Sequence, residues 1–380
     1  MPVPLPTSDE ANLELPDQTE VLRCAAGVLS ATRVGGFNTE FQKLLIAATF
    51  EAMTGHSIES SLLPFIDAAT NGENLRYRTA MFRMRMVHMM VLSALVLRPL
   101  PPEVAASVNA YSRELGIDDN LLRTVEQFAS SNAAIAAIDF ERNGYTADWT
   151  TAQSASMHTS LSTGWAVANH DVDLAARWMA LGGLAEGTLG RRLHDFYRAR
   201  GFSFPGSPGS APPLLAQHDW VHVLADFGTT VEAELEVFAF IARANDNPKG
   251  FSLLAMVVSL FETGYLQAGA GLFEAFPGQL SHSGMTLRIG DAMRRGALSH
   301  GPDGEPDVDF MQVDWFRFAD MAVESVRERF GVVPKPPRAI DAGSATPWQP
   351  GGISPFQVKS GQQLAEASGV PYESYGASVL

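Results

Sequence analysis

The sequence predicts an all-α protein with two helical domains, a disordered N-terminal segment and a C-terminal tail. Apolar residues recur at three- and four-residue spacing from Phe41 to Ala52, which places them on one face of a helix. The stretch Leu75–Leu97 is rich in Met and Arg at the same spacing, and the prolines after Arg98 end it because proline lacks an amide donor. No β-rich window interrupts this half of the sequence.

The length of 380 residues allows two domains. Residues 1–19 are proline-rich and acidic, so little of this segment can be buried and we expect it to be disordered. Helical patterns occupy residues 20–145 and 165–332, and we interpret the polar stretch 146–164 between them as a linker. Residues 333–380 are dense in proline, glycine and serine, which predicts a tail or an arm that wraps the surface.

Net charge, cysteine content and the N-terminal residues exclude or disfavour several classes of protein. A net charge of −15 disfavours nucleic acid as a partner, because a phosphate backbone is repelled by it. Cys24 is the single cysteine, which excludes a disulfide within the chain and a cysteine-rich zinc site and fits a reducing compartment. The N-terminus has neither a basic start nor an apolar core, so we expect no secretory signal. These features indicate a cytoplasmic protein, either free or peripheral on the inner face of a membrane.

Two apolar stretches bear on membrane contact and assembly. Met84–Leu97 and Phe251–Phe261 both fall short of the about 20 apolar residues that cross a bilayer. We expect buried helices there, with a surface helix that dips into a membrane as the alternative. The longer stretch Phe251–Gly271 presents one apolar helix face, which suits the core, a homodimer interface or the wall of a tunnel for an isoprenoid chain.

A group of histidines and acids near the middle of the chain is the strongest candidate site. His218 and His222 are four residues apart and project from the same face of a helix, and Asp219 flanks that face. A new helix starts at Thr229, so Glu234 falls in its second turn, where a tight hairpin would bring it back toward the histidines. Two imidazoles with one or two carboxylates suit a divalent metal: zinc, Fe(II), Mn or Co.

The spacing alone leaves other interpretations open. A histidine pair of this kind also occurs as a hydrogen-bonded surface pair, and acids are common on solvated helix faces. Three further acids lie close enough in sequence to replace Asp219 or Glu234 as ligands: Asp226, Glu232 and Glu236.

Two more residues are candidates for roles around the metal. Asp226 lies one turn after His222 and would orient its ring, although it would serve equally well as a solvated charge at a helix end. Arg191 follows a glycine-flanked turn, where its guanidinium could hold a phosphate or carboxylate with two hydrogen bonds. The alternative for Arg191 is an ordinary exposed charge.

The motif resembles a known family. His218-Asp219-Trp-Val-His222, followed after eleven residues by Glu234, is similar to the signature of the Coq-four family of coenzyme Q (ubiquinone) biosynthesis proteins. Flanking segments agree with that family in the same order: residues 184–191, 195–197, 201–202, 292–296, 313–315 and 326–331. The resemblance covers about residues 175–332. The N-terminal half is faintly similar to TerB-like helical domains, which implies no activity.

The resemblance implies a ligand set, a substrate class and a reaction. The four motif residues would bind a divalent metal, usually given as zinc, and the substrate would be the prenylated aromatic precursor of ubiquinone. The family is implicated in removing the ring carboxyl at C1, with hydroxylation there, and in organising other biosynthetic enzymes. An oxidative step would need a redox-active metal or a helper cofactor, because zinc accepts no electrons.

The leading hypothesis is therefore a metal-dependent, decarboxylase-type enzyme of quinone or related prenyl-lipid biosynthesis. In it, Arg191 would hold an anionic group of the substrate and Asp226 would orient a ligand. One alternative is a non-catalytic scaffold that binds the prenyl lipid and presents it to other enzymes. A third is a metallohydrolase that acts on a phosphate ester.

Overall fold

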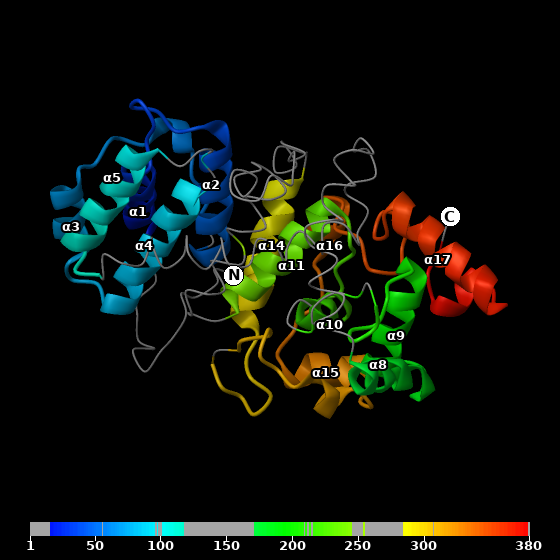
Figure 1. Cartoon of the computed structure of the whole chain (residues 1–380). Coiled ribbons are helices and arrows are strands. Elements are labelled where there is room, and N and C mark those ends of the chain that lie inside the picture. The colour runs from blue at the N-terminus through cyan, green and yellow to red at the C-terminus, as the bar shows by residue number, and fades with distance from the viewer. Residues whose placement is uncertain are drawn as a thin grey trace. The chain divides into compact units, whose positions relative to one another are not determined.

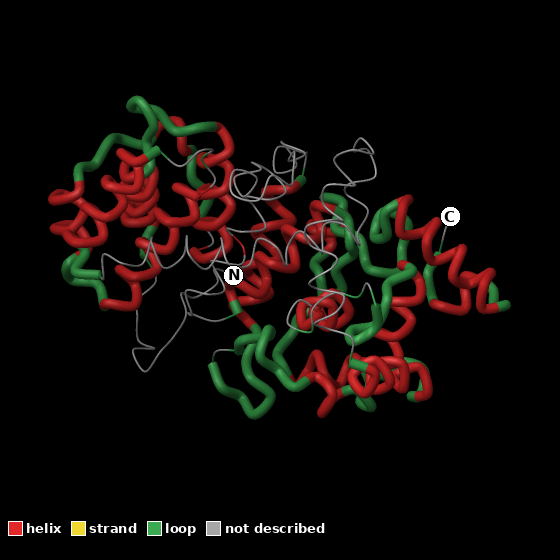
Figure 2. The backbone as a smooth tube through the Cα atoms, viewed as in Figure 1, coloured by secondary structure: helices red, strands yellow, loops and turns green. Residues whose placement is uncertain are grey.

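The computed structural model describes residues 16–117, 171–244 and 284–378 together with Leu254, apart from residues 55, 96, 98–100, 209, 211–212, 214–215 and 307. Within these ranges it contains thirteen α-helices and no strand beyond two isolated bridges (Figure 2). This confirms the predicted all-α class. The stretches 146–164 and 255–271, where we predicted a linker and most of an apolar helix, lie outside the described residues.

The chain divides into two compact units that are not continuous in sequence. One comprises Met1–Asn132, Phe238–Gly301 and Glu305–Val308, and the other Ala133–Val237, Pro302–Gly304 and Asp309–Leu380. The boundary near residue 237 falls inside a helix, α11 (Val231–Arg243). The domain boundaries suggested by the sequence remain a prediction.

Six described helices lie wholly in the first unit, and the second half of α11 belongs to it as well. The six are α1 (Gln18–Ala31), α2 (Glu40–Thr54), α3 (Ala68–Leu75), α4 (Ala80–Leu95), α5 (Pro102–Glu114) and α14 (Met285–Leu298) (Figure 1). Helix α2 packs on α14 and α1 packs on α4. Buried Gln42 ties three segments together by donating from its amide to the carbonyls of Thr32 and Ser93.

The start of α1 lies within the segment that we expected to be disordered. Asp17 caps the helix by accepting a hydrogen bond from the backbone N–H of Glu20 at 2.8 Å, which satisfies one of the free amides of the first turn. Gln18 is therefore already helical. Residues 1–15 lie outside the described part of the chain.

The apolar patterns of the N-terminal half form helices, as predicted. Leu45 on α2 and Met86, Met89 and Met90 on α4 are buried, which agrees with their expected place in a core. In the part of the chain that the structure describes, none of the helices combines the length and apolarity that crossing a bilayer requires.

The second unit holds the candidate site. Its α-helices are α8 (Val172–Met179), α9 (Leu189–Arg200), α10 (Ala216–Ala225), α15 (Val323–Arg329), α16 (Pro337–Asp341), α17 (Pro355–Ser368) and the first half of α11. Short 3₁₀ turns join them, among them Ala180–Gly183, Trp315–Phe318 and Tyr372–Tyr375. Helix α10 packs against α9 and α15.

The C-terminal residues 333–378, for which we predicted a tail or an arm that wraps the surface, contain regular helices. They form two helices, α16 and α17, and α17 begins with a capping box in which Ser354 and Gln357 satisfy each other's backbone N–H groups. Gly361 lets α17 approach α9 so closely that an added Cβ would lie 2.0 Å from the carbonyl oxygen of Ala199. Ser354 and Gly361, two of the serines and glycines that are dense in this segment, serve capping and close packing.

Candidate metal centre

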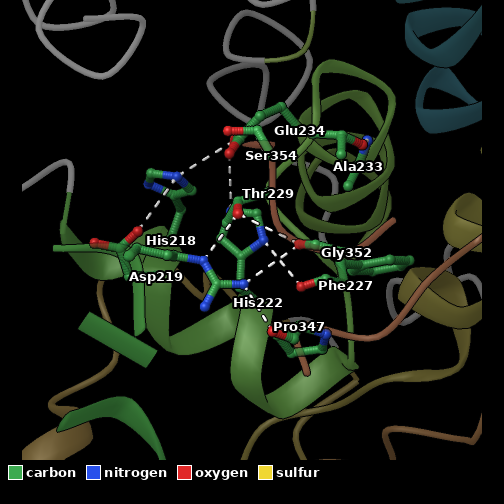
Figure 3. A network of polar contacts seen from close by, with 12 residues as sticks. His218, Asp219, His222, Phe227, Thr229, Ala233, Glu234, Pro347, Gly352 and Ser354 are labelled. Atoms are coloured by element: carbon green, nitrogen blue, oxygen red, sulfur yellow. Dashed lines mark hydrogen bonds and ion pairs between the residues drawn. The ribbon is translucent and has the colours of Figure 1, made fainter. Parts of the chain in front are cut away.

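Helices α10 and α11 carry the four predicted metal-binding residues. His218, Asp219 and His222 lie on α10, and Glu234 lies on α11 after a short turn. All four side chains are fully shielded from solvent, with 0% exposure. Figure 3 shows Asp219, His218 and Glu234 joined in a row, with His222 beside them.

Glu234 lies between the two imidazoles. Its Oε2 is 3.5 Å from Nε2 of His218, and its Oε1 is 3.4 Å from Nε2 of His222. Oδ1 of Asp219 is 3.7 Å from Nε2 of His218. One ligand atom from each of His218, Asp219 and His222 falls within 4.8 Å of the others. These three residues lie close enough together to hold a single ion, and Glu234 lies within 3.5 Å of both histidines.

Contacts behind two of these residues fix their orientation. The hydroxyl of Tyr197 on α9 donates to Oδ2 of Asp219 at 2.5 Å. Nδ1 of His222 lies 3.3 Å from the backbone carbonyl oxygen of Phe227, so the proton belongs on Nδ1, where it can be donated. Nε2 of His222 then faces Glu234 and is the ring atom that a metal ion would bind. Outer hydrogen bonds of this kind are how metal-binding histidines and carboxylates are usually held.

The turn between α10 and α11 is shaped by Asp226, the residue that follows α10. Among the described residues it is the one non-glycine residue with a positive φ, 65°, a conformation that Asp tolerates better than most residues. This turn brings the Phe227 carbonyl back toward His222. Arg327 on α15 supports the same helix end by donating from Nε to the carbonyl of Leu224 at 2.8 Å.

The C-terminal segment clamps the next part of the turn. The backbone N–H of Gly228 donates to Ala345, and that of Thr229 donates to Gly352, at 3.1 and 2.8 Å. Buried Arg200 joins both sides, because its guanidinium donates to the Thr229 hydroxyl at 2.8 Å and to the Pro347 carbonyl at 2.9 Å. Figure 3 shows Thr229, Gly352 and Pro347 around this network. The hairpin that carries the site is thus held by residues more than a hundred positions away.

The chemistry of the cluster fits a divalent cation. Burial by itself would raise the pKa of Glu234, but the neighbouring His222 and His218 outweigh it and hold that pKa below its ordinary value, so Glu234 is a carboxylate. Within the described residues, both of its oxygens and Nε2 of His222 make no hydrogen bond. Buried polar atoms without hydrogen bonds are costly, and a metal ion would satisfy all three at once.

Two further predicted residues lie outside this cluster. Arg191 on α9 binds Asp195 through Nε at 3.0 Å and the Gly182 carbonyl through Nη1 at 3.2 Å, which places it in a local structural network. Asp226 extends toward Arg327, 3.8 Å away, and is partly exposed. The ring of His222 is met by the Phe227 carbonyl instead of by Asp226. The roles that we assigned to Arg191 and Asp226 in substrate and ligand orientation remain predictions.

Sequence reasoning did not find Tyr197, Phe227 or Arg200. Tyr197 and Arg200 act through the packing of α9 on the hairpin, which has no local signature, and Phe227 acts through its backbone. The capping pattern Ser354-Pro-Phe-Gln357 was a usable signal for α17.

Comparisons with known proteins assign this chain to no family. No family model matches the chain, and no curated protein matches it. A crystal structure from Nostoc punctiforme PCC 73102, whose description proposes a ubiquinone biosynthesis protein, aligns with 66% of this chain and 97% of its own at 20% identity and a TM-score of 0.28. A likeness at that level is too weak to assign a fold or a function.

Proposed function

We propose that this chain is a divalent-metal-dependent enzyme that removes the ring carboxyl group of a prenylated aromatic acid in quinone or related prenyl-lipid biosynthesis. The observation that carries the metal dependence is the buried convergence of two imidazoles and two carboxylates from α10 and α11. The substrate class rests on the resemblance of this motif to the Coq-four signature.

Different residues would bind the metal ion, orient one of its ligands and exclude water from the site. His218, His222, Asp219 and Glu234 would hold the metal, which supplies a positive charge that stabilises negative charge developing on the substrate as CO2 leaves. The Phe227 carbonyl keeps the proton of His222 on Nδ1, away from the ion. Aromatic rings around the cluster, such as Phe196 stacked 5.7 Å from His222, exclude water and so strengthen that electrostatic effect.

A second candidate function is a non-catalytic scaffold that binds a prenyl lipid and presents it to other enzymes. It is favoured by the complete burial of all four side chains, because structural metal sites are closed whereas catalytic ones keep a position open. In this case the metal would stabilise the hairpin and would not touch the lipid.

Native mass spectrometry combined with elemental analysis tests the common part of both proposals. Protein purified without chelators is expected to carry close to one divalent metal per chain and a co-purified prenyl lipid. Metal far below one equivalent would contradict the assignment of the centre.

The substitution His222→Ala separates the candidates. An enzyme loses turnover of the prenylated acid while lipid still co-purifies, whereas a scaffold that stays folded without the ion still supports quinone synthesis in cells. His56→Ala serves as the control, since this histidine lies in the first unit. Release of phosphate from generic esters by the unaltered protein would instead indicate a metallohydrolase.

A further inference from the structure

The two carboxylates of the metal centre are held in different ways. Asp219 accepts the short hydrogen bond from Tyr197, whose ring is fully buried and stacks on Phe204 with centroids 5.3 Å apart and planes 10° apart. Glu234 has no such support, because its oxygens accept no hydrogen bond within the described residues and face the two imidazoles at 3.4 and 3.5 Å.

We propose that Tyr197 is a positioning residue that fixes Asp219 as a permanent ligand through Oδ1, and that Glu234 is the ligand that moves aside when an anionic substrate binds. This inference rests on the proposed metal-dependent function. It resolves the conflict between a closed, fully buried set of four side chains and a catalytic role, because one of the four can be exchanged for a carboxylate or phenolate of the substrate.

The energetics favour this division between the two acids. A hydrogen bond from a hydroxyl to a carboxylate is about twice as strong as one between neutral groups, and turning Asp219 away would leave both partners buried without it. Movement of Tyr197 would break the packing of its ring against the rings of Phe204 and Trp178, whose centroids lie 5.3 and 5.5 Å away. Glu234 has a longer side chain than Asp219, and moving it gives up its contacts with the two imidazoles at 3.4 and 3.5 Å but no hydrogen bond from a hydroxyl.

A cobalt titration of Tyr197→Phe tests the positioning role. Co²⁺ reports its coordination through visible absorption bands, and the substitution removes only the hydroxyl. We expect affinity for Co²⁺ to fall by about tenfold, the lower end of what loss of an outer hydrogen bond costs, and the bands to change because Oδ2 is freed. The matched control is Tyr372→Phe, which removes another buried tyrosine hydroxyl, donated to Ala199 at 2.9 Å. The control is expected to keep the affinity and spectrum of the unaltered protein.

A pair of charge-neutralising substitutions tests the exchangeable ligand. Asp219→Asn is expected to reduce Co²⁺ affinity more than Glu234→Gln does, because only the first alters the anchored ligand. Benzoate, a simple aromatic carboxylate, is expected to perturb the Co²⁺ spectrum at a lower concentration in Glu234→Gln than in the unaltered protein, because the position it would take is less tightly held.

The outcomes separate this inference from the proposed function. Failure of the unaltered protein to bind Co²⁺ or any other divalent metal would overturn both. If the unaltered protein binds the metal but Tyr197→Phe matches Tyr372→Phe, the positioning role is wrong and the proposed function stands. Equal losses of affinity in Asp219→Asn and Glu234→Gln, with no difference toward benzoate, would overturn the exchange of Glu234.

Discussion

At the scale of single residues, the orientation of His222 depends on a backbone atom. The Phe227 carbonyl oxygen lies 3.3 Å from Nδ1 of His222. The positive φ of Asp226 turns the chain so that this carbonyl faces the ring. The conformation of residue 226 therefore contributes to the site, whereas its charge is directed at Arg327 in a partly exposed pair.

This difference predicts the effect of Asp226→Asn. Asparagine tolerates the left-handed conformation as well as aspartate does, so the turn is kept while the charge is lost. We expect metal affinity to stay within about twofold of the unaltered protein and stability to change by less than about 1 kcal/mol, the range of a partly exposed ion pair. Isothermal titration with the metal and urea unfolding measure the two quantities. A tenfold loss of affinity would show that the carboxylate of Asp226 orients His222 after all.

The residues of the site differ in how far sequence alone could identify them. His218 and His222 follow from helical spacing, because side chains four residues apart must share a face. Choosing Glu234 over Glu232 or Glu236 needed the family motif, since spacing leaves all three open. The family resemblance includes residues 195–197, but the role of Tyr197 could not be identified, because its contact with Asp219 depends on how α9 packs against α10.

At the scale of elements, the helical hairpin of α10 and α11 is braced by the C-terminal segment. The Thr229 hydroxyl is central to this contact, since it accepts from Arg200 at 2.8 Å and donates to the Gln357 side chain at 2.6 Å. Gln357 also donates to the Thr229 carbonyl at 3.4 Å. A side chain at the start of α17 thereby fixes the turn that delivers Glu234 to the histidines.

Thr229→Val removes this hydroxyl while keeping the shape of the side chain. Buried groups on Arg200 and Gln357 then lose a hydrogen bond each, so we expect a loss of about 2 kcal/mol in the free energy of unfolding. Metal affinity should fall as well, because the hairpin is less well held. Urea unfolding of metal-loaded protein checks the first quantity. Ser360→Ala, at an exposed hydroxyl on α17, is the control and should change stability by less than about 0.5 kcal/mol; an equal effect of the two substitutions would argue against the brace.

The helices of the hairpin could be predicted, but their brace could not. Apolar periodicity and the acids near Thr229 locate α10 and α11 because those signals are local. The role of residues 345–357 depends on backbone carbonyls that meet the turn from a distant part of the chain, and composition carries no trace of such contacts. Their prolines and glycines predicted a tail or an arm that wraps the surface, without saying which residues such an arm would contact.

At the scale of the whole molecule, the two units carry separate natural probes. Cys24, the single cysteine, belongs to the first unit, and burial, followed by the nearby charge of Glu20, raises the pKa of its thiol. Four of the six tryptophans lie among the described residues, and all four belong to the second unit: Trp178, Trp220, Trp315 and Trp348. The four proposed metal ligands belong to that second unit as well.

This distribution predicts how a metal changes unfolding. An ion that binds only the folded second unit stabilises it by about 2.7 kcal/mol at a concentration one hundred times its dissociation constant. We expect zinc to move the urea midpoint seen by tryptophan fluorescence upward, and the midpoint seen by labelling of Cys24 at pH 8 to move less. Chelation should reverse the shift, and His222→Ala should abolish it. If zinc leaves the urea midpoint of tryptophan fluorescence unchanged, the proposed metal site is wrong. Equal shifts of the fluorescence and Cys24-labelling midpoints would mean that the two units unfold together, because α11 belongs to both.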